Sequence, residues 1–180
     1  MVSALSTRRG RALGAVAATL SLLLLSGCGA ILDELGTPQE APRDEPGGEV
    51  TASAEADIFS LKVGDCIDMD ALEAMYEGDS AELDAVPVVP CADPHTGEVF
   101  GETTLPDGDY PGEEAVDAAA EEFCLPAFTD FVGLTYDESI YQYFPFTPTS
   151  DGWTIGSDRV IQCVIVTEEP VTASLQGAAQ

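Results

Sequence analysis

Short apolar runs alternate with turn-forming and acidic stretches along most of the chain, and the centre of this pattern lies between residues 86 and 104. An apolar run at 86 to 89 leads into a polar corner at 93 to 97, and residues 99 to 104 are rich in β-branched and aromatic types. Runs of this kind on either side of a Pro/Gly corner are typical of β-strands. The pattern therefore predicts two strands, and the corner between them holds His95, the only histidine of the chain.

Helical spacing marks two further segments. Residues 69 to 84 are mostly Asp, Glu, Ala and Met, with apolar residues at helical intervals, which predicts a short acidic helix followed by a loop. A longer helix should begin at Pro111, with Glu113 and Glu114 in the first turn, where the helix dipole favours acids, and end at Gly133. Its apolar stripe, which we expect to face the core, consists of Val116, Ala120, Phe123, Ala127 and Phe131, with Cys124 beside them.

The remaining pattern completes one domain at residues 58 to 168. Residues 61 to 67 alternate like a strand, a dense aromatic segment occupies 140 to 148, and residues 159 to 166 have the pattern of a buried final strand. The expected fold is α+β, a small disulfide-stapled domain with an antiparallel sheet and one main helix packed on it. Proline at position 126 lies inside that helix, and because it lacks an amide N–H, we expect a kink or a split there.

The first 27 residues have the pattern of an export signal. Three arginines precede an uncharged stretch at 12 to 25, which is too short for a stable membrane span. The residues that follow, Leu25-Ser26-Gly27-Cys28, resemble the bacterial lipobox, in which a diacylglycerol is attached to the cysteine thiol and the signal is cut before it. An ordinary cleavage site with an incidental cysteine is the alternative. We predict a lipoprotein signal peptide at 1 to 27 and lipidation at Cys28, which would anchor the protein to the outer face of the cell membrane.

Low apolar content marks the two ends of the predicted domain. Residues 28 to 57 contain scattered Pro, Gly, Glu and Ala, so after the lipidated cysteine we predict a disordered acidic tether with an r.m.s. reach of ~30 Å. Residues 169 to 180 are polar and rich in alanine, which predicts a disordered tail. No second apolar run long enough to span a membrane follows the signal, so we expect the mature protein to be anchored and not to span.

The charge balance excludes one class of partner. The chain has 33 acidic and 6 basic residues, and its formal net charge is -27. After removal of the signal, only Arg43, Lys62 and Arg159 remain as cations. Such a chain repels phosphate backbones, so we expect no nucleic-acid binding. A solvated acidic surface explains the charge without any specific function.

Four cysteines remain when Cys28 is set aside as the anchor. An even number of cysteines in an exported chain predicts two disulfides, and four cysteines allow three pairings. Proximity in sequence favours Cys66 with Cys91 and Cys124 with Cys163. Paired cysteines stabilise a small domain by ~2 to 4 kcal/mol each and leave no free thiol for nucleophilic chemistry.

A set of motifs spread over the predicted domain resembles a known family. The motifs are Gly64-Asp65-Cys66, then Val88-Val89-Pro90-Cys91-x-x-Pro94-His95-x-x-Glu98-Val99, then a helix bearing Cys124, then Trp153-x-x-Gly156-x-x-Arg159-x-x-x-Cys163. Together they resemble the septum formation family of actinobacterial envelope proteins. The resemblance implies an exported or membrane-anchored module connected with cell division or the cell envelope, and it implies no catalytic residue.

Five residues of these motifs are candidates for a binding site. Pro94, His95 and Glu98 lie at the corner between the central strands, and Trp153 and Arg159 precede the final strand. His95 is either a ligand or pH-sensitive contact beside Glu98, or a residue that bonds the backbone and fixes the turn. Arg159 either pairs with a structural carboxylate or joins Trp153 in a recognition site, where its planar fork could not be replaced by lysine.

The chain lacks the common catalytic motifs. A single histidine excludes zinc sites built on a histidine pair, and the sequence contains no nucleophile elbow, P-loop or dinucleotide fingerprint. We therefore expect no enzyme, no catalytic residue, no bound metal and no cofactor. A carboxylate pair of the glycosidase type is defined by its spatial separation, so the sequence leaves that possibility open.

The expected function is that of a non-enzymatic, lipid-anchored interaction module in the cell envelope. It would bind an unidentified envelope or division protein through the surface around Pro94, His95 and Glu98 and the aromatic segment at 141 to 153. The alternative is a lipoprotein that binds a glycan or another small ligand, because exposed aromatic rings stack on sugars. That alternative requires that some of these side chains be exposed: Tyr141, Tyr143, Phe144 and Phe146.

Overall fold

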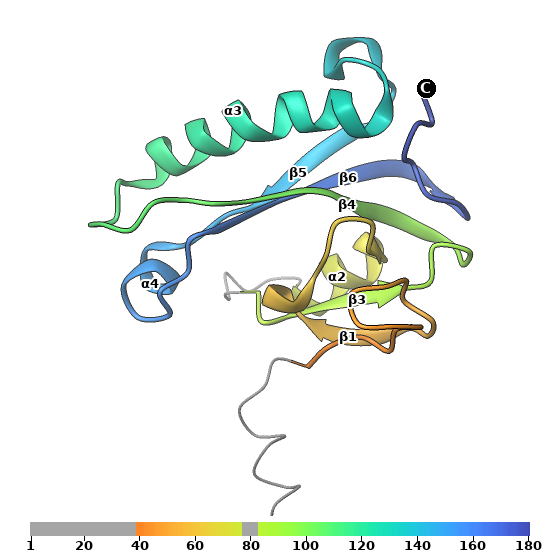
Figure 1. Ribbon diagram of the computed structural model, residues 1–180, viewed down its shortest axis with the longest axis horizontal. Helices are drawn as coiled ribbons and strands as arrows, with labels where there is room; N and C mark the ends of the chain where they lie inside the picture. The colour runs from red at the N-terminus through yellow and green to blue at the C-terminus, as the bar shows by residue number, and fades with distance from the viewer. Residues whose placement is uncertain (1–38, 77–82) are drawn as a thin grey trace, which may run out of the picture. The chain divides into compact units, whose positions relative to one another are not determined.

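The computed structural model describes residues 39 to 76 and 83 to 180, and these form one sheet with helices on it (Figure 1). The strands are β1 (Ala54–Asp57), β2 (Cys66–Ile67), β3 (Ala85–Val89), β4 (His95–Thr104), β5 (Gln142–Phe146) and β6 (Val160–Val171). The helical elements are η1 (Ile58–Ser60), α2 (Met69–Tyr76), α3 (Glu113–Val132), η2 (Tyr136–Glu138) and α4 (Ser150–Thr154). The α+β prediction with one main helix is confirmed.

The sheet has the strand order β1-β3-β2-β4-β6-β5, and every neighbouring pair is antiparallel. The predicted pair of strands around the Pro/Gly corner is confirmed as β3 and β4, although β2 and not β3 is the direct neighbour of β4. The longest pairing joins β4 to β6, where His95 lies opposite Val171 and Thr104 opposite Val160. This register places the two ends of β4 at opposite ends of the domain.

Both faces of the central strands are covered. Side chains alternate along a strand, so Val99 and Val164 belong to one core and Phe100 and Cys163 to another. The first core lies among β1, β2, β3 and α2, and the second lies under α3, which runs across the sheet in Figure 1. Burial on both faces explains why the predicted final strand is apolar without alternation.

Helix α3 packs closely on β4 at a glycine. A Cβ atom at Gly101 would lie 3.2 Å from Phe123 Cε1 and 3.3 Å from Ala127 Cβ, so the absence of a side chain allows this approach. The Cys124–Cys163 disulfide joins α3 to β6. Packing and disulfide together fix the helix on this face of the sheet.

The main helix is not split at its proline. It continues through Pro126 to Val132, and Gly133 ends it in the left-handed conformation, as the sequence predicts. Because Pro126 has no N–H, the carbonyl of Glu122 has no hydrogen-bond donor four residues further along the helix. Glu122 lies on the exposed side of the helix, where water can donate to this carbonyl instead. Packing of the apolar stripe therefore outweighs the lost hydrogen bond.

Residues 39 to 57 are folded, so the predicted disordered tether was wrong over this range. Ala41 and Val50 are buried in the first core, and β1 pairs with β3 along its whole length. Arg43 forms an ion pair with Asp65, far along the sequence. The apolar residues of this segment are few and show no regular spacing, but the buried ones pack against residues from the rest of the domain.

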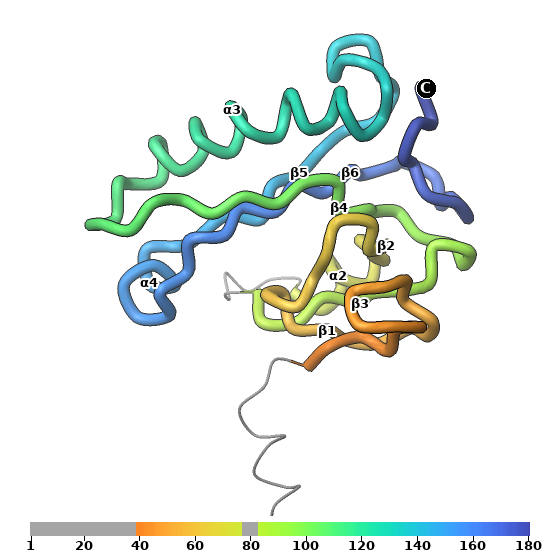
Figure 2. Tube along the Cα trace, in the orientation of Figure 1, coloured from red at the N-terminus to blue at the C-terminus, as the bar shows by residue number. Residues whose placement is uncertain are grey.

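The predicted disordered tail at 169 to 180 was also wrong. Strand β6 continues to Val171, and Leu175 is buried in the second core. The backbone N–H groups of Gly177 and Ala179 donate to the last turn of α3 at 2.7 and 3.0 Å. Figure 2 shows the segment after β6 turning back beside the end of α3. Its order comes from contacts with distant residues and not from its own composition.

Other predictions lie outside the described residues. These are the signal peptide at 1 to 27, Cys28 and the part of the tether before residue 39. The short acidic helix is confirmed as α2, whereas residues 77 to 82 of the predicted loop are not described. Within the described ranges, no helix has the length and apolar character to cross a membrane.

Candidate functional site

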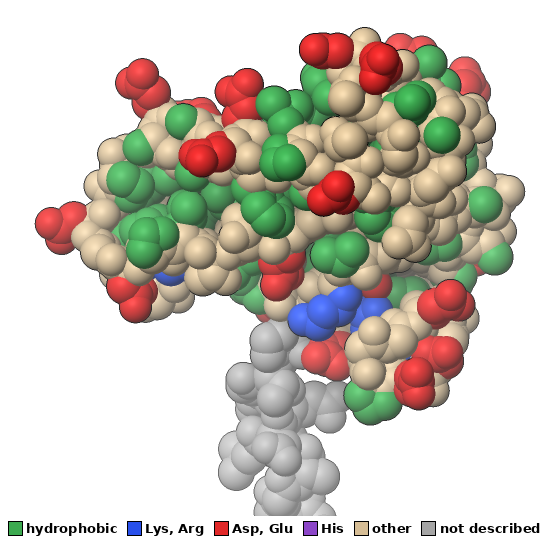
Figure 3. Space-filling model, turned by 45° about the horizontal axis from the view of Figure 1, so that its top comes forward, with side chains coloured by type: hydrophobic (Ala, Val, Ile, Leu, Met, Phe, Trp, Pro, Cys, Tyr) green, Lys and Arg blue, Asp and Glu red, His purple; other side chains and the backbone are tan. Residues whose placement is uncertain are grey.

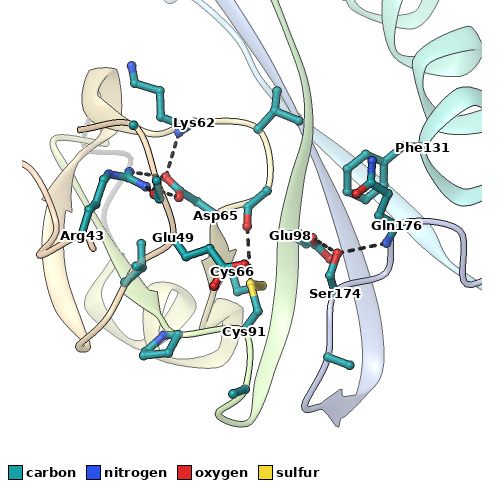
Figure 4. Close-up of a pocket in the computed structure, with 18 of the residues that line it drawn as sticks. Arg43, Glu49, Lys62, Asp65, Cys66, Cys91, Glu98, Phe131, Ser174 and Gln176 are labelled. Carbon is teal, nitrogen blue, oxygen red and sulfur yellow. Dashed lines mark hydrogen bonds and ion pairs between the residues drawn. A yellow bond between two sulfur atoms is a disulfide. The ribbon is translucent and has the colours of Figure 1, made fainter. Parts of the chain in front are cut away.

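Two hollows stand out in the described part of the domain, and we name each by its lining. The disulfide cleft has a volume of about 620 Å³ and lies between the loop before β1, the segment leading into β2, the corner after β3 and the C-terminal segment (Figure 4). The apolar groove has a volume of about 540 Å³ and lies between η1, β5, α4 and the start of β6. The two hollows differ in chemistry.

A buried ion pair forms one wall of the disulfide cleft. Arg43 donates from its two terminal nitrogens to the two carboxylate oxygens of Asp65, each at 2.7 Å, and both side chains are nearly inaccessible. Asp65 also accepts from the backbone N–H of Lys62 at 2.8 Å. The hydrogen bonds with Asp65 raise the pKa of Arg43 above its ordinary value. This bidentate geometry holds the N-terminal loop against the strand that begins at Cys66.

Cations are concentrated at this cleft. Figure 3 shows acidic side chains spread over the face turned to the viewer, and Lys and Arg side chains gathered mainly at one place on it. Arg43 and Lys62, two of the three Lys and Arg residues that follow position 28, both line the disulfide cleft. Arg43 is engaged by Asp65, so Lys62 is the cation that remains exposed to solvent there.

Glu98 is a fully buried carboxylate that binds the C-terminal segment. Its side-chain oxygens accept from the hydroxyl of Ser174 and from the backbone N–H of Leu175, each at 2.6 Å. Burial raises the pKa of Glu98 above its ordinary value, and the two hydrogen bonds oppose that rise. Figure 4 shows Ser174 turned toward Glu98 from the segment after β6. Glu98 therefore fastens this segment to the centre of the sheet.

The same carboxylate lies beside a disulfide. The oxygen of Glu98 and the sulfurs of Cys66 and Cys91 all lie within 4.8 Å of one another, and no other set of three such groups is this close in the described ranges. The two sulfurs are bonded to each other, so they are not thiolate ligands for a metal. The two disulfides follow the pairing that proximity in sequence favours.

His95 is buried, and it fixes the corner before β4. Its Nδ1 lies 2.8 Å from the carbonyl oxygen of Asp93, and because a carbonyl only accepts, Nδ1 carries the proton. The interpretation that His95 bonds the backbone of the turn is therefore confirmed. Its Nε2 is also buried, and it has no hydrogen-bond partner among the described residues.

Trp153 and Arg159 form a brace between α4 and the loop after β4. The Arg159 guanidinium carbon lies 3.8 Å from the centre of the Trp153 ring, and Arg159 donates to the Trp153 carbonyl at 2.9 Å. The indole N–H donates to the carbonyl of Gly108 at 2.9 Å. Arg159 Nε also lies 3.6 Å from a carboxylate oxygen of the exposed Asp107. Trp153 is 4 % exposed, so the pair acts inside the fold.

The predicted site residues do not share one surface. His95 and Glu98 lie at the start of β4, whereas Trp153 and Arg159 lie beyond the opposite end of that strand. Of the five candidates only Pro94 is exposed; His95, Glu98 and Trp153 are buried and Arg159 is half-buried. Each of the buried motif residues makes a contact within the fold. These contacts explain why the residues occur in the sequence motifs without invoking a binding partner.

Large apolar side chains from η1, from β5 and from the residue after α4 are exposed in the apolar groove. Phe59 is 55 % exposed, Phe144 51 % and Ile155 82 %, and all three line the groove. In the aromatic segment Tyr141 and Phe146 are buried, so Phe144 is its most exposed ring. Sequence reasoning missed the groove because η1 lies far from β5 and α4 in the sequence. A signal that was available is the isoleucine at position 155 in a polar turn.

The comparisons with known proteins point to one family. A family model described as "Septum formation" matches residues 63–179, which is most of the described domain. No curated protein and no solved structure matches the chain significantly.

Proposed function

Because the chain belongs to the septum formation family, we propose that it is a lipid-anchored, extracytoplasmic interaction module of the cell envelope that takes part in septum formation. Two disulfides in one small domain support an oxidising compartment. The signal pattern at 1 to 27 and the lipobox ending in Cys28 support export followed by anchoring. The domain binds another protein of the envelope and performs no catalysis.

One observation carries the binding role, namely that three large apolar side chains from separate elements are exposed in one groove. Complete burial of an Ile or Phe side chain stabilises by about 1.5 to 3 kcal/mol. Phe59, Phe144 and Ile155 are 55 %, 51 % and 82 % exposed, so each of them forgoes half or more of that stabilisation. Single exposed apolar residues are common, but a group that lines a concave surface is typical of a binding site. The groove is therefore the partner-binding surface of this domain.

The segment of the partner protein that enters the groove is apolar and is flanked by Lys or Arg. The lining of the groove includes Asp84 and Asp151, and the whole chain is strongly acidic, so a basic segment is attracted and an acidic one is repelled. Strand β5 forms an edge of the sheet, but Pro145 has no N–H and interrupts any ladder with an added strand. Recognition therefore rests on side chains in the groove rather than on strand addition.

A photo-cross-linking experiment in cells that produce the full chain tests this surface. A photoreactive phenylalanine analogue at position 144 should give a covalent adduct, and the adduct should disappear in the Ile155→Ser variant. The same analogue at Ile140, which is 70 % exposed but lies outside the groove, is the matched control and should give no such adduct. The captured peptide should carry apolar residues flanked by Lys or Arg.

Equal adducts at positions 140 and 144, or an adduct that survives Ile155→Ser, would remove the groove from the proposal. An adduct with an acidic peptide would contradict the proposed chemistry of the partner. These outcomes leave the family membership and the lipid anchor untouched, because both rest on other observations.

A second function has one observation in its favour. Phe144 and Phe59 offer exposed rings in a hollow, and such rings stack on sugars, so a glycan or small-ligand-binding lipoprotein is the alternative. Soluble cell-wall glycan fragments added to the purified protein would then perturb the groove resonances in NMR spectra. The alternative is rejected if Phe144→Ser leaves glycan binding unchanged.

A further inference from the structure

The two disulfides of this domain have different surroundings. Cys124 and Cys163 are both fully buried between α3 and β6, within the second core. Cys66 is also fully buried, but its partner Cys91 is partly exposed and lines the disulfide cleft. Exposure of one sulfur is what an attacking thiolate needs, so only one of the two bonds can be reached in the folded protein.

The cleft gives a reactant access to that bond. It has a volume of about 620 Å³, and several of its lining residues, such as Lys62 and Ala92, are exposed to solvent. Lys62 is a cation at this entrance, and a cation favours the approach of an anionic thiolate. The Cys91 sulfur lies 3.4 Å from the carbonyl oxygen of Gly64, which can accept a hydrogen bond from a Cys91 thiol (Figure 4).

A proton-carrying group lies on the buried side of the same bond. The Glu98 carboxyl is within 4.8 Å of both sulfurs and has no exposed surface. Charged and titratable groups around it are His95 on β4 and, along the cleft wall, Glu49, Lys62 and the Arg43–Asp65 pair. Ser174 and Leu175 hold the carboxyl in place without removing its capacity to bind a proton. Burial favours its protonated form.

We propose that Cys66–Cys91 is an exchangeable disulfide, that its reactant is an extracytoplasmic dithiol, and that Glu98 transfers the proton to and from Cys66. A thiolate of the dithiol attacks the Cys91 sulfur and forms a mixed disulfide with it. The Cys66–Cys91 bond breaks, and its electron pair leaves on Cys66. The Cys66 thiolate then takes the proton of the Glu98 carboxylic acid, which becomes a carboxylate.

The second half of the exchange releases the reactant. Its other thiolate attacks its own sulfur in the mixed disulfide, so the reactant closes as a disulfide and Cys91 leaves as a thiolate. Cys91 takes a proton from solvent in the cleft. The protein pair is reduced by two electrons and the dithiol is oxidised by two electrons. In the reverse sequence Glu98 removes the Cys66 proton, and the disulfide passes from the oxidised reactant back to Cys66 and Cys91.

The first test needs no variant. The full chain is incubated with dithiothreitol under native conditions, and free thiols are blocked at intervals and located by peptide mass spectrometry. Cys66 and Cys91 should become reduced at least about tenfold faster than Cys124 and Cys163, since only the former bond can be reached. Equal rates for the two pairs, or reduction that requires denaturant, would overturn the proposal.

A second test separates proton transfer from simple access. Glu98→Gln keeps the size of the side chain but cannot carry a proton, so exchange should slow by at least about tenfold. The pH dependence that remains should be that of the thiolate fraction of the attacking dithiol alone. Glu98→Asp should recover part of the rate. Ser174→Ala loosens the C-terminal segment but keeps the carboxyl, so it should not slow exchange. An exchange rate in Glu98→Gln equal to or above that of the wild type would show that Glu98 only controls access.

Discussion

At the scale of single residues, the buried Glu98 has a consequence for stability as a function of pH. Burial is the main cause of its raised pKa, so the folded state binds a proton more readily than the unfolded state does. The contribution of Glu98 to stability is fully present below its ordinary pKa of 4.5 and is lost as pH rises through the raised value. Glu98→Gln removes this loss.

We therefore expect the free energy of unfolding of Glu98→Gln, relative to the wild type, to increase as pH rises from about 4 to 8. Urea unfolding at several pH values measures the difference. Glu168→Gln, a substitution of an exposed carboxylate on the same sheet, is the control and should show a smaller change. A difference for Glu98→Gln that is flat, or that falls with pH, would contradict the role given to burial.

Arg43 gives a second prediction at this scale. Arg43→Ala leaves the Asp65 carboxylate buried without its bidentate partner, and a broken buried pair costs about 3 to 5 kcal/mol. Replacing both residues with alanine should cost less than Arg43→Ala alone, because no charge then stays buried. Denaturant unfolding measures both variants, and Lys62→Ala, which removes the exposed cation of the same cleft, should change stability by less than about 0.5 kcal/mol. A similarly small effect of Arg43→Ala would mean that Asp65 is solvated.

The sequence reveals the identity of such residues but not their role. The spacing of Pro94, His95 and Glu98 marks the corner, yet the partners of Glu98 lie in the C-terminal segment, 76 and 77 residues away. No local pattern carries that pairing. Trp153 and Arg159 are closer in sequence, so their spacing could suggest the contact between them. The spacing does not show whether this contact faces solvent or the interior, because that depends on the loop whose Gly108 carbonyl accepts from the indole N–H.

At the scale of elements, strong periodicity predicts structure and its absence does not exclude it. The end signal of helix α3 at Gly133 is confirmed. Its apolar stripe is confirmed in part: Val116, Ala120 and Phe131 are buried as predicted, whereas Phe123 and Ala127 are partly buried and the unpredicted Phe128 is fully buried. Residues 39 to 57 contain no repeated spacing, yet they supply β1 and three buried residues of the first core, Ala41, Val50 and Ala56. An edge strand needs a partner on one side only, so a few apolar residues at suitable positions are sufficient.

The N-terminal segment therefore decides where the domain can be shortened. A chain that begins at Ile58 lacks β1 and Arg43, and it leaves Val86 and Val88 of β3 with one side of their core open. We expect it to lose at least the ~3 to 5 kcal/mol of the broken ion pair relative to a chain that begins at Gln39. Thermal unfolding followed by circular dichroism compares the two. Equal melting temperatures would show that residues 39 to 57 only lie on the surface of an independent domain.

At the scale of the whole molecule, this order changes the reach of the proposed anchor. Residues 29 to 38 are all that separate Cys28 from the first described residue, and a chain of that length spans at most ~35 Å. The sequence alone predicted a tether of nearly thirty residues. The apolar groove therefore stays close to the membrane, so the proposed partner segment must also lie close to the membrane.

Imaging of living cells tests the lipid anchor, the apolar groove and recruitment to the septum together. A fluorescent protein that matures outside the cytoplasm is fused to the C-terminus. A flexible linker separates the two, because the Gln180 carbonyl accepts hydrogen bonds from Ile140 and Ser139 that a direct fusion could disturb. The fusion should be enriched at the septum, Phe144→Ser combined with Ile155→Ser should spread it evenly along the membrane, and Ile140→Ser should leave it at the septum. Cys28→Ala should abolish the membrane signal altogether. An even rim in the wild type would keep the anchor but remove septal recruitment, and groove variants that stay at the septum would assign recruitment to another surface.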